Sequence, residues 1–220
     1  MTPGPDQVVA CPHCSGLARY HTINSGNTFG ARIWTDGKRI APMLPEPPRV
    51  VKCHDCRNCY WLADARKVGE VGGWRPEAGA TSPAWLAEPV VEEPAEEDYY
   101  RLLESGSPVA AKRLRVLRTL AWWRRNDTFR DAAPDDRPAS AIASGPCRSN
   151  LEALVDLLQQ DNGDTALMRA EALRELGDFA GAAQALSTVS QAKAGWVVQR
   201  IAGLCEAGDT CVRELRMERQ

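Results

Sequence analysis

The sequence is poor in the residues and motifs on which most catalytic sites depend. Its 220 residues include only three histidines, and all three lie within the first 54 positions. It contains no Gly-rich phosphate-binding loop, no His-Glu-x-x-His motif and no Gly-x-Ser-x-Gly nucleophile elbow. We therefore expect no catalytic residues and no enzymatic activity. The sequence also indicates no organic cofactor and no small-molecule substrate.

The chain also lacks long apolar runs and an excess of charge of one sign. No stretch approaches the roughly 18 consecutive apolar residues of a membrane helix, and the first residues lack the basic-then-apolar pattern of a secretory signal. We expect a cytoplasmic protein with no membrane partner. The formal net charge of −2 excludes a strongly basic body that coats nucleic acid, so a nucleic-acid contact would have to be local.

What the sequence does contain is a concentration of cysteine near its start. Five of the eight cysteines form close-spaced clusters, at Cys11 and Cys14 and then at Cys53, Cys56 and Cys59. Such spacing is typical of metal binding in a reducing compartment rather than of a disulfide scaffold. Two Cys-x-x-Cys pairs supply four thiolates for one tetrahedral zinc site. We expect the remaining three to be small buried hydrophobic residues: Cys147, Cys205 and Cys211.

The second cysteine pair is ambiguous because Cys53, Cys56 and Cys59 are each three positions apart. We predict Cys53 and Cys56 as the ligands, since the extended segment 50–52 before them mirrors the segment 8–10 before Cys11. In the alternative, Cys56 and Cys59 bind the ion and Cys53 is spare.

The residues around the cysteines favour tight turns. Pro12 presets one φ angle, and we expect Gly16 to adopt the unusual φ that follows. His13 and His54 lie inside the two loops, where a ligand would point away from the sulfur atoms. We do not expect either histidine to bind metal.

Residues 8–62 resemble a zinc ribbon, a module of two cysteine knuckles and a small antiparallel sheet. The pattern predicts strands at 17–22 and 59–62 and a hairpin around Asp36-Gly37. The resemblance implies one structural Zn²⁺ per chain, with a rubredoxin-like iron site as the alternative. Four sulfur ligands leave no coordination position for an activated water. The chain departs from the ribbon pattern in the 38 residues between the two knuckles.

Composition divides the chain into three parts: a zinc-ribbon domain at 1–68, a linker rich in Pro, Gly and acidic residues at 69–95, and a helical domain at 96–220. The fold class is therefore α+β. We expect the apolar linker residues to pack on a flanking domain: Trp74, Trp85 and Leu86.

The first half of the helical domain carries many basic residues. We predict helices at 96–104 and 108–125, and place Trp122 outside the apolar arc of the second helix. Seven basic residues surround this exposed tryptophan: Lys112, Arg113, Arg115, Arg118, Arg124, Arg125 and Arg130. They could contact nucleic acid, although the acidic run at 92–98 offers them intramolecular partners. An exposed Trp flanked by arginines is equally typical of a protein-interface anchor.

The second half predicts three or four helices. We expect Asn150 to cap a helix at 151–158 and the sequence 162–164 to end it. Residues from about 165 to 190 resemble a tetratricopeptide repeat, with Gly177 at the turn between two helices. Residues 204–209 echo residues 173–178 after 31 positions. An ordinary helical hairpin is the alternative, because a solenoid usually needs at least three repeats.

These patterns favour a protein-interaction or adaptor module that binds zinc. The partner would be a protein of unknown identity. The alternative is a nucleic-acid-associated regulator that uses the ribbon and the basic helix 108–125.

Overall fold

Segments that are distant in the sequence come together in each of two units. The computed structural model describes residues 1–72, 82–105, 110–132, 141–159 and 165–216. The first unit comprises Met1–Ala31 and Ile40–Asp98, and the second comprises Arg32–Arg39 and Tyr99–Gln220. Residues 32–39, which we expected in the zinc-ribbon domain, thus belong with the helices.

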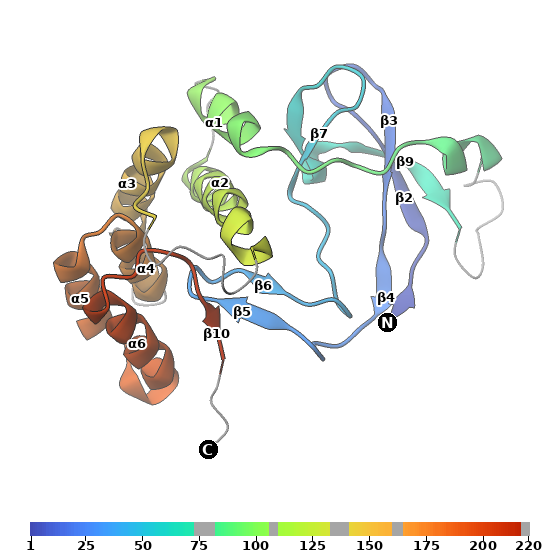
Figure 1. Cartoon of the computed structure of the whole chain (residues 1–220). Coiled ribbons are helices and arrows are strands. Elements are labelled where there is room, and N and C mark those ends of the chain that lie inside the picture. Colours follow the sequence, from blue (N-terminus) through green and yellow to red (C-terminus); the bar gives the residue numbers. More distant parts are fainter. Residues whose placement is uncertain (73–81, 106–109, 133–140, 160–164, 217–220) are drawn as a thin grey trace. The chain divides into compact units, whose positions relative to one another are not determined.

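The first unit is built from short antiparallel strands (Figure 1). They form a three-stranded sheet in the order β3-β2-β9 and two separate pairs, β1-β4 and β7-β8. The strands are β1 Thr2–Pro3, β2 Asp6–Ala10, β3 Leu17–Tyr20, β4 Ile23–Ser25, β7 Val50–Lys52, β8 Cys59–Trp61 and β9 Arg66–Val71. Residues 69–71, expected as the start of a linker, belong to β9, where they pair with β2.

The acidic segment at 92–98 belongs to the first unit. After a 3₁₀ helix at Pro83–Ala87, Val91 N donates to Arg19 O at 2.9 Å. The Lys52 ammonium pairs with Asp98 at 2.8 Å, and Arg57 pairs with Glu92 at 2.9 Å. Two of the carboxylates expected to face the basic helix thus find partners in the first unit.

The apolar residues expected to pack onto a domain differ in their surroundings. Trp85 is half-buried, whereas Leu86 remains 58% exposed. Trp74 lies outside the described residues.

The helices confirm the predicted α+β class. Within the described part of the chain there are six: α1 Glu96–Glu104, α2 Ala111–Asp131, α3 Gly145–Gln159, α4 Ala166–Glu175, α5 Phe179–Ser187 and α6 Gln191–Glu206. The hydrophobic core of the second unit draws on α2 to α6 and includes Trp122, Leu151, Leu154, Ala170, Ala182 and Ile201. No helix in the described ranges is both long and apolar enough to cross a membrane.

Two helix boundaries differ from the prediction. Helix α2 continues to Asp131 rather than ending near Arg125. Helix α3 begins at Gly145, with Pro146 in its first turn, where a missing N–H costs no hydrogen bond. Asn150 is therefore inside α3 and does not cap it; its Nδ2 donates to Arg118 O at 3.0 Å. The expected helix start at 107–108 and helix end at 162–164 lie outside the described residues.

The two similar segments 173–178 and 204–209, which are 31 positions apart, end helices α4 and α6 in the same way. Gly177 and Gly208 both have positive φ, at 82° and 66°, which suits a residue without a Cβ. Asp178 N donates to Leu173 O at 2.9 Å, and Asp209 N to Leu204 O at 3.0 Å. The structures that follow the two segments differ. Asp178 caps α5 by accepting from Gly181 N at 2.8 Å, whereas the residues after Asp209 continue to strand β10. Tetratricopeptide ancestry stays a prediction.

The hairpin around Asp36-Gly37 forms as predicted, and it carries the strand order β10-β5-β6. Strands β5 and β6 span Arg32–Trp34 and Arg39–Ile40, and β10 spans Glu214–Leu215. Gly37 has a φ of 79° at the turn. Strand β10 pairs antiparallel with β5 (Figure 1), so the end of the described chain meets residues near position 33.

A buried carboxylate joins this hairpin to α2. Asp36 is fully buried and forms an ion pair with the buried guanidinium of Arg130. Asn126 Nδ2 donates to Asp36 Oδ2 at 3.0 Å, and Trp123 Nε1 donates to the Asp36 carbonyl at 3.0 Å. These contacts explain why the hairpin belongs to the helical unit.

We expect Asp36→Ala to lower the free energy of unfolding by about 1–3 kcal/mol, because the buried Arg130 guanidinium and the Asn126 amide lose an acceptor, while Asp127 still pairs with Arg130 at 2.7 Å. Urea denaturation measures the change. Asp156→Ala, at an exposed position on α3, is the matched control and should change stability little. Equal stability of the two variants would contradict a structural role for the Asp36 pair.

Candidate metal centre

The two Cys-x-x-Cys segments fold into matching knuckles. Ser15 N donates to Cys11 O at 2.9 Å, and Arg57 N donates to Cys53 O at 3.1 Å. The residue after each pair adopts positive φ, 64° at Ser15 and 59° at Arg57. We expected this conformation at Gly16, and that expectation was wrong. A Cβ at Gly16 would lie 2.0 Å from the carboxylate of the exposed Asp55 side chain, which would have to move to admit it.

The knuckles bring four sulfur atoms together. The Sγ atoms of Cys11, Cys14, Cys53 and Cys56 all lie within 4.8 Å of one another. Cys11 and Cys56 are 3.8 Å apart, and Cys14 and Cys53 are 3.6 Å apart. Four sulfurs at about 2.3 Å from a tetrahedral ion would be about 3.8 Å from each other. The spacing therefore fits a thiolate-bound metal ion.

Hydrogen bonding and burial give the thiols unequal acidities. Burial raises the pKa of Cys11 to about 12, while a backbone N–H from Asn58 lowers the pKa of Cys56 to about 7. Backbone N–H groups also approach Cys11 and Cys14, from His13 and Gly16 respectively, each at 3.4 Å. A metal ion would have to displace the Cys11 proton at neutral pH, which makes its binding pH-dependent.

The other candidate ligands lie elsewhere. Cys59 begins β8, where it pairs with Lys52, and it is not part of the four-sulfur group. His13 is exposed, and His54 Nε2 donates to Val90 O at 2.9 Å. Neither histidine is in the group of candidate ligands found among the described residues.

The three remaining cysteines occupy the helical unit. Cys147 and Cys211 are buried, and Cys205 is half-buried. Burial raises the pKa of Cys205 and of Cys211. Thiols in such surroundings are weak nucleophiles.

The tryptophan that we placed on the surface of the basic helix is buried. Trp122 has 0% exposure because it packs among the residues of the helical core, and its Nε1 donates to Glu175 Oε2 at 2.7 Å. Arg130 is also buried, in its pair with Asp36. Arg125 lies over the ring of Phe129, with 4.8 Å between Cζ and the ring centroid. The expected cluster of cations around an exposed aromatic is therefore not formed.

A buried acid next to Trp122 was not predicted from the sequence. Burial raises the pKa of Glu175 well above its ordinary value, and the nearby carboxylates of Glu171 and Asp36 add to this shift. Asn126 Nδ2 links two of these acids, since it lies 3.0 Å from both Glu175 Oε1 and Asp36 Oδ2. The regular helical pattern of residues 166–175 gives no signal that a carboxylate there lies in the core.

Arg174 neutralises part of this acidic cluster. Its Nε donates to Glu171 Oε2 at 2.8 Å, and its Nη2 donates to Glu171 Oε1 at 2.6 Å and to Cys211 O at 2.8 Å. The fully buried guanidinium thus holds the segment after α6 against α4. Such fully bonded groups are typical of a structural network rather than of a reactive one.

Comparisons with protein-family models, with curated proteins and with solved structures gave no match to this chain.

Removing one cluster cysteine should remove the metal. We expect Cys11→Ser and Cys56→Ser to abolish stoichiometric metal binding and to unfold the first unit, because three thiolates leave the ion's shell open. Elemental analysis of purified protein measures the metal, and Cys59→Ser is the matched control that should keep it. Metal retention in Cys53→Ser together with loss in Cys59→Ser would support the alternative ligand set, in which Cys56 and Cys59 bind the ion.

Glu175 should make stability decline with pH. Its pKa is higher in the folded chain than in the unfolded chain. Its contribution to the free energy of unfolding is thus complete below the unfolded pKa of about 4.3 and falls as pH rises above it. We expect Glu175→Gln to remove this decline and become the more stable protein at pH 8, measured by urea denaturation.

Glu175→Ala is the companion variant. It leaves the indole N–H of Trp122 without its acceptor and should lower stability by about 1–3 kcal/mol at every pH. A stability difference between wild type and Glu175→Gln that does not vary between pH 5 and pH 8 would contradict the raised pKa.

Proposed function

We propose that this chain is a zinc-binding protein-interaction or adaptor module of the cytoplasm, without catalytic activity. The observation that carries the proposal is the group of four sulfur atoms at tetrahedral spacing. Four protein ligands would fill the shell of Zn²⁺ and leave no position for an activated water or a substrate. The ion would therefore stabilise a small β unit, of the zinc-ribbon kind, whose surfaces perform the function.

Zinc suits this site better than other ions because Zn²⁺ accepts four thiolates in a tetrahedral shell without redox chemistry. We expect one zinc per chain and no visible absorption. Iron in the same shell would colour the protein, so elemental analysis and a visible spectrum of the purified chain distinguish the two metals. Less than one equivalent of any metal would contradict the proposal.

The last helix offers a surface for a protein partner. Trp196 on α6 is 42% exposed, and Arg200 and Gly203 are exposed one and two turns further on. Residues at this spacing share one helix face. Open space surrounds Gly203, so a partner could approach the backbone there. Trp and Arg are the residues most enriched in interface hot spots.

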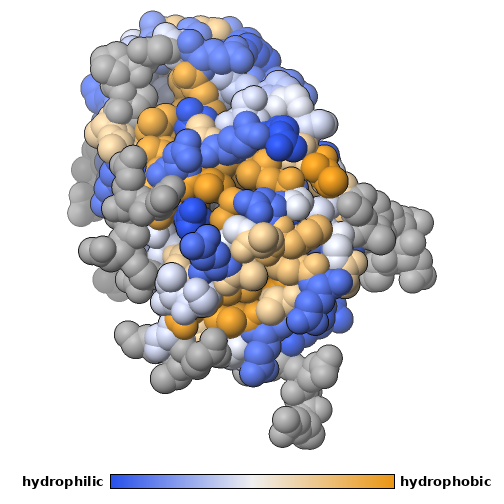
Figure 2. Space-filling view, turned by 90° about the vertical axis from the view of Figure 1, so that its left-hand side faces the viewer, coloured by the Kyte–Doolittle hydropathy of each residue, from blue (hydrophilic) through white to orange (hydrophobic). Residues whose placement is uncertain are grey.

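The face drawn in Figure 2 carries hydrophobic and hydrophilic side chains next to one another. Non-obligate protein interfaces have this composition, with an apolar centre and a polar rim.

Capture from the native cell tests the interaction. The full chain should retain a defined set of proteins, and Trp196→Ala should lose that set. Ile142→Ala is the matched control, because Ile142 is also an exposed apolar residue of the second unit, at 54%. The same capture by wild type and Trp196→Ala would contradict an interface on α6.

We favour a protein over a nucleic acid as the partner because Trp122 and Arg130 are buried and Arg125 covers Phe129. The chain should therefore give no mobility shift with generic DNA or RNA at low salt. A salt-dependent shift that is lost when Arg115, Arg118, Arg124 and Arg125 become Glu would instead support a nucleic-acid-associated regulator.

A further inference from the structure

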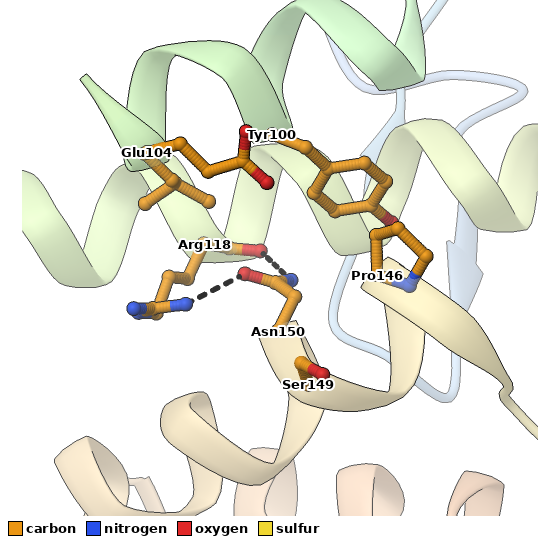
Figure 3. Close-up of a pocket in the computed structure, with 7 residues that line it drawn as sticks. Tyr100, Glu104, Arg118, Pro146, Ser149 and Asn150 are labelled. Carbon is orange, nitrogen blue, oxygen red and sulfur yellow. Dashed lines mark hydrogen bonds between the residues drawn. The ribbon is translucent and has the colours of Figure 1, made fainter.

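Three helices of the second unit surround a pocket of about 380 Å³. It lies between the end of α1, the middle of α2 and the start of α3 (Figure 3). Its size falls within the range of about 300–1,000 Å³ that is typical of small-molecule sites. The lining residues are Tyr100, Leu103, Glu104, Arg118, Pro146, Ser149 and Asn150.

Arg118 is the cation of this pocket, and it has no counter-charge among the described residues. Its Nη1 donates to the neutral amide oxygen of Asn150 at 3.2 Å. Within the residues that the structure describes, its buried Nε has no hydrogen-bond partner, and no carboxylate pairs with its guanidinium. Burial alone lowers the pKa of Arg118. Arg118 is half-buried, and partial removal of a guanidinium from water without an anion is unfavourable, so a bound anion would offset part of this cost.

Asn150 holds this guanidinium in place. The Asn150 side chain is buried and also donates through Nδ2 to the Arg118 carbonyl at 3.0 Å. The two residues are thus joined by reciprocal hydrogen bonds across α2 and α3 (Figure 3). Pre-orientation of this kind reduces the entropy that a cation loses when it binds a ligand.

The other lining residues restrict which chemical groups a bound anion can have. Tyr100, Leu103 and Pro146 supply apolar surface, and the exposed Ser149 supplies a hydroxyl. Glu104 also lines the pocket, and Figure 3 shows its carboxylate directed toward Tyr100 rather than toward the Arg118 guanidinium. A second negative charge on a ligand would be repelled by Glu104. An apolar body with one negative group fits these walls.

We propose that this pocket binds a small organic acid with one carboxylate, which pairs with Arg118 while the apolar body of the ligand lies against Tyr100, Leu103 and Pro146. A planar carboxylate can accept two parallel hydrogen bonds from a guanidinium. The inference goes beyond the proposed interaction with a protein and does not depend on it.

Titrations of the isotope-labelled full chain, followed by NMR, test the site with defined probes. 3-Phenylpropionate should shift the amide signals of Leu103, Ser149 and Asn150 in a saturable manner. The neutral 3-phenylpropanamide and inorganic phosphate should each bind at least tenfold more weakly. Equal binding of the acid and the amide would overturn the proposal, as would tighter binding of phosphate or the absence of saturable shifts in these residues.

Variants of two pocket residues sharpen the test. Arg118→Gln should weaken 3-phenylpropionate binding at least tenfold, whereas Arg115→Gln, the same charge change on the same helix, should leave it unchanged. Glu104→Gln should allow the dicarboxylate phenylsuccinate to bind more tightly than it binds wild type. Equal affinities in Arg118→Gln and Arg115→Gln would contradict the assignment. If Arg118→Gln does not fold, the comparison of acid with amide on wild type decides the matter.

Discussion

The close grouping of four cysteine sulfur atoms is the constraint on which the first unit depends. The sulfur atoms of two knuckles lie within 4.8 Å of one another, and Cys11 is buried, so its ionised form is unfavourable without a cation. The strands around them are two to six residues long, and a core that small supplies little stabilisation. A metal ion held by the four sulfurs would join the segments that follow β2 and β7.

The second unit depends on buried charge. Asp36, Arg130, Glu171 and Arg174 are all buried, and each charge is matched by an opposite one or by backbone groups. Removing charges from water is unfavourable, so their geometry must be satisfied in full. This requirement ties the β5–β6 hairpin and the segment after α6 to the helices. It also explains how residues 32–39 join a unit that otherwise begins at Tyr99.

Arg118 departs from this pattern of matched charge. It is held by Asn150 and meets no carboxylate among the described residues. The buried cations Arg130 and Arg174 of this unit are neutralised internally, whereas the half-buried Arg118 faces a pocket that could hold an external anion. The exposed face of α6 is a separate surface, and the two can act independently.

Local signals in the sequence were sufficient for much of this architecture. Cysteine spacing, the Asp36-Gly37 turn and the Gly177-Asp178 turn each act over a few residues, and each produces the predicted local structure. Such local signals do not predict the packing of segments that are distant in the sequence. Helical periodicity placed Trp122 outside the apolar arc, yet an acceptor 53 positions away, on α4, lets its indole be buried. The pairings of Asp36 with Arg130 and of Arg118 with Asn150 likewise join distant segments, because the partner of a buried polar group is chosen by tertiary geometry and not by neighbouring sequence.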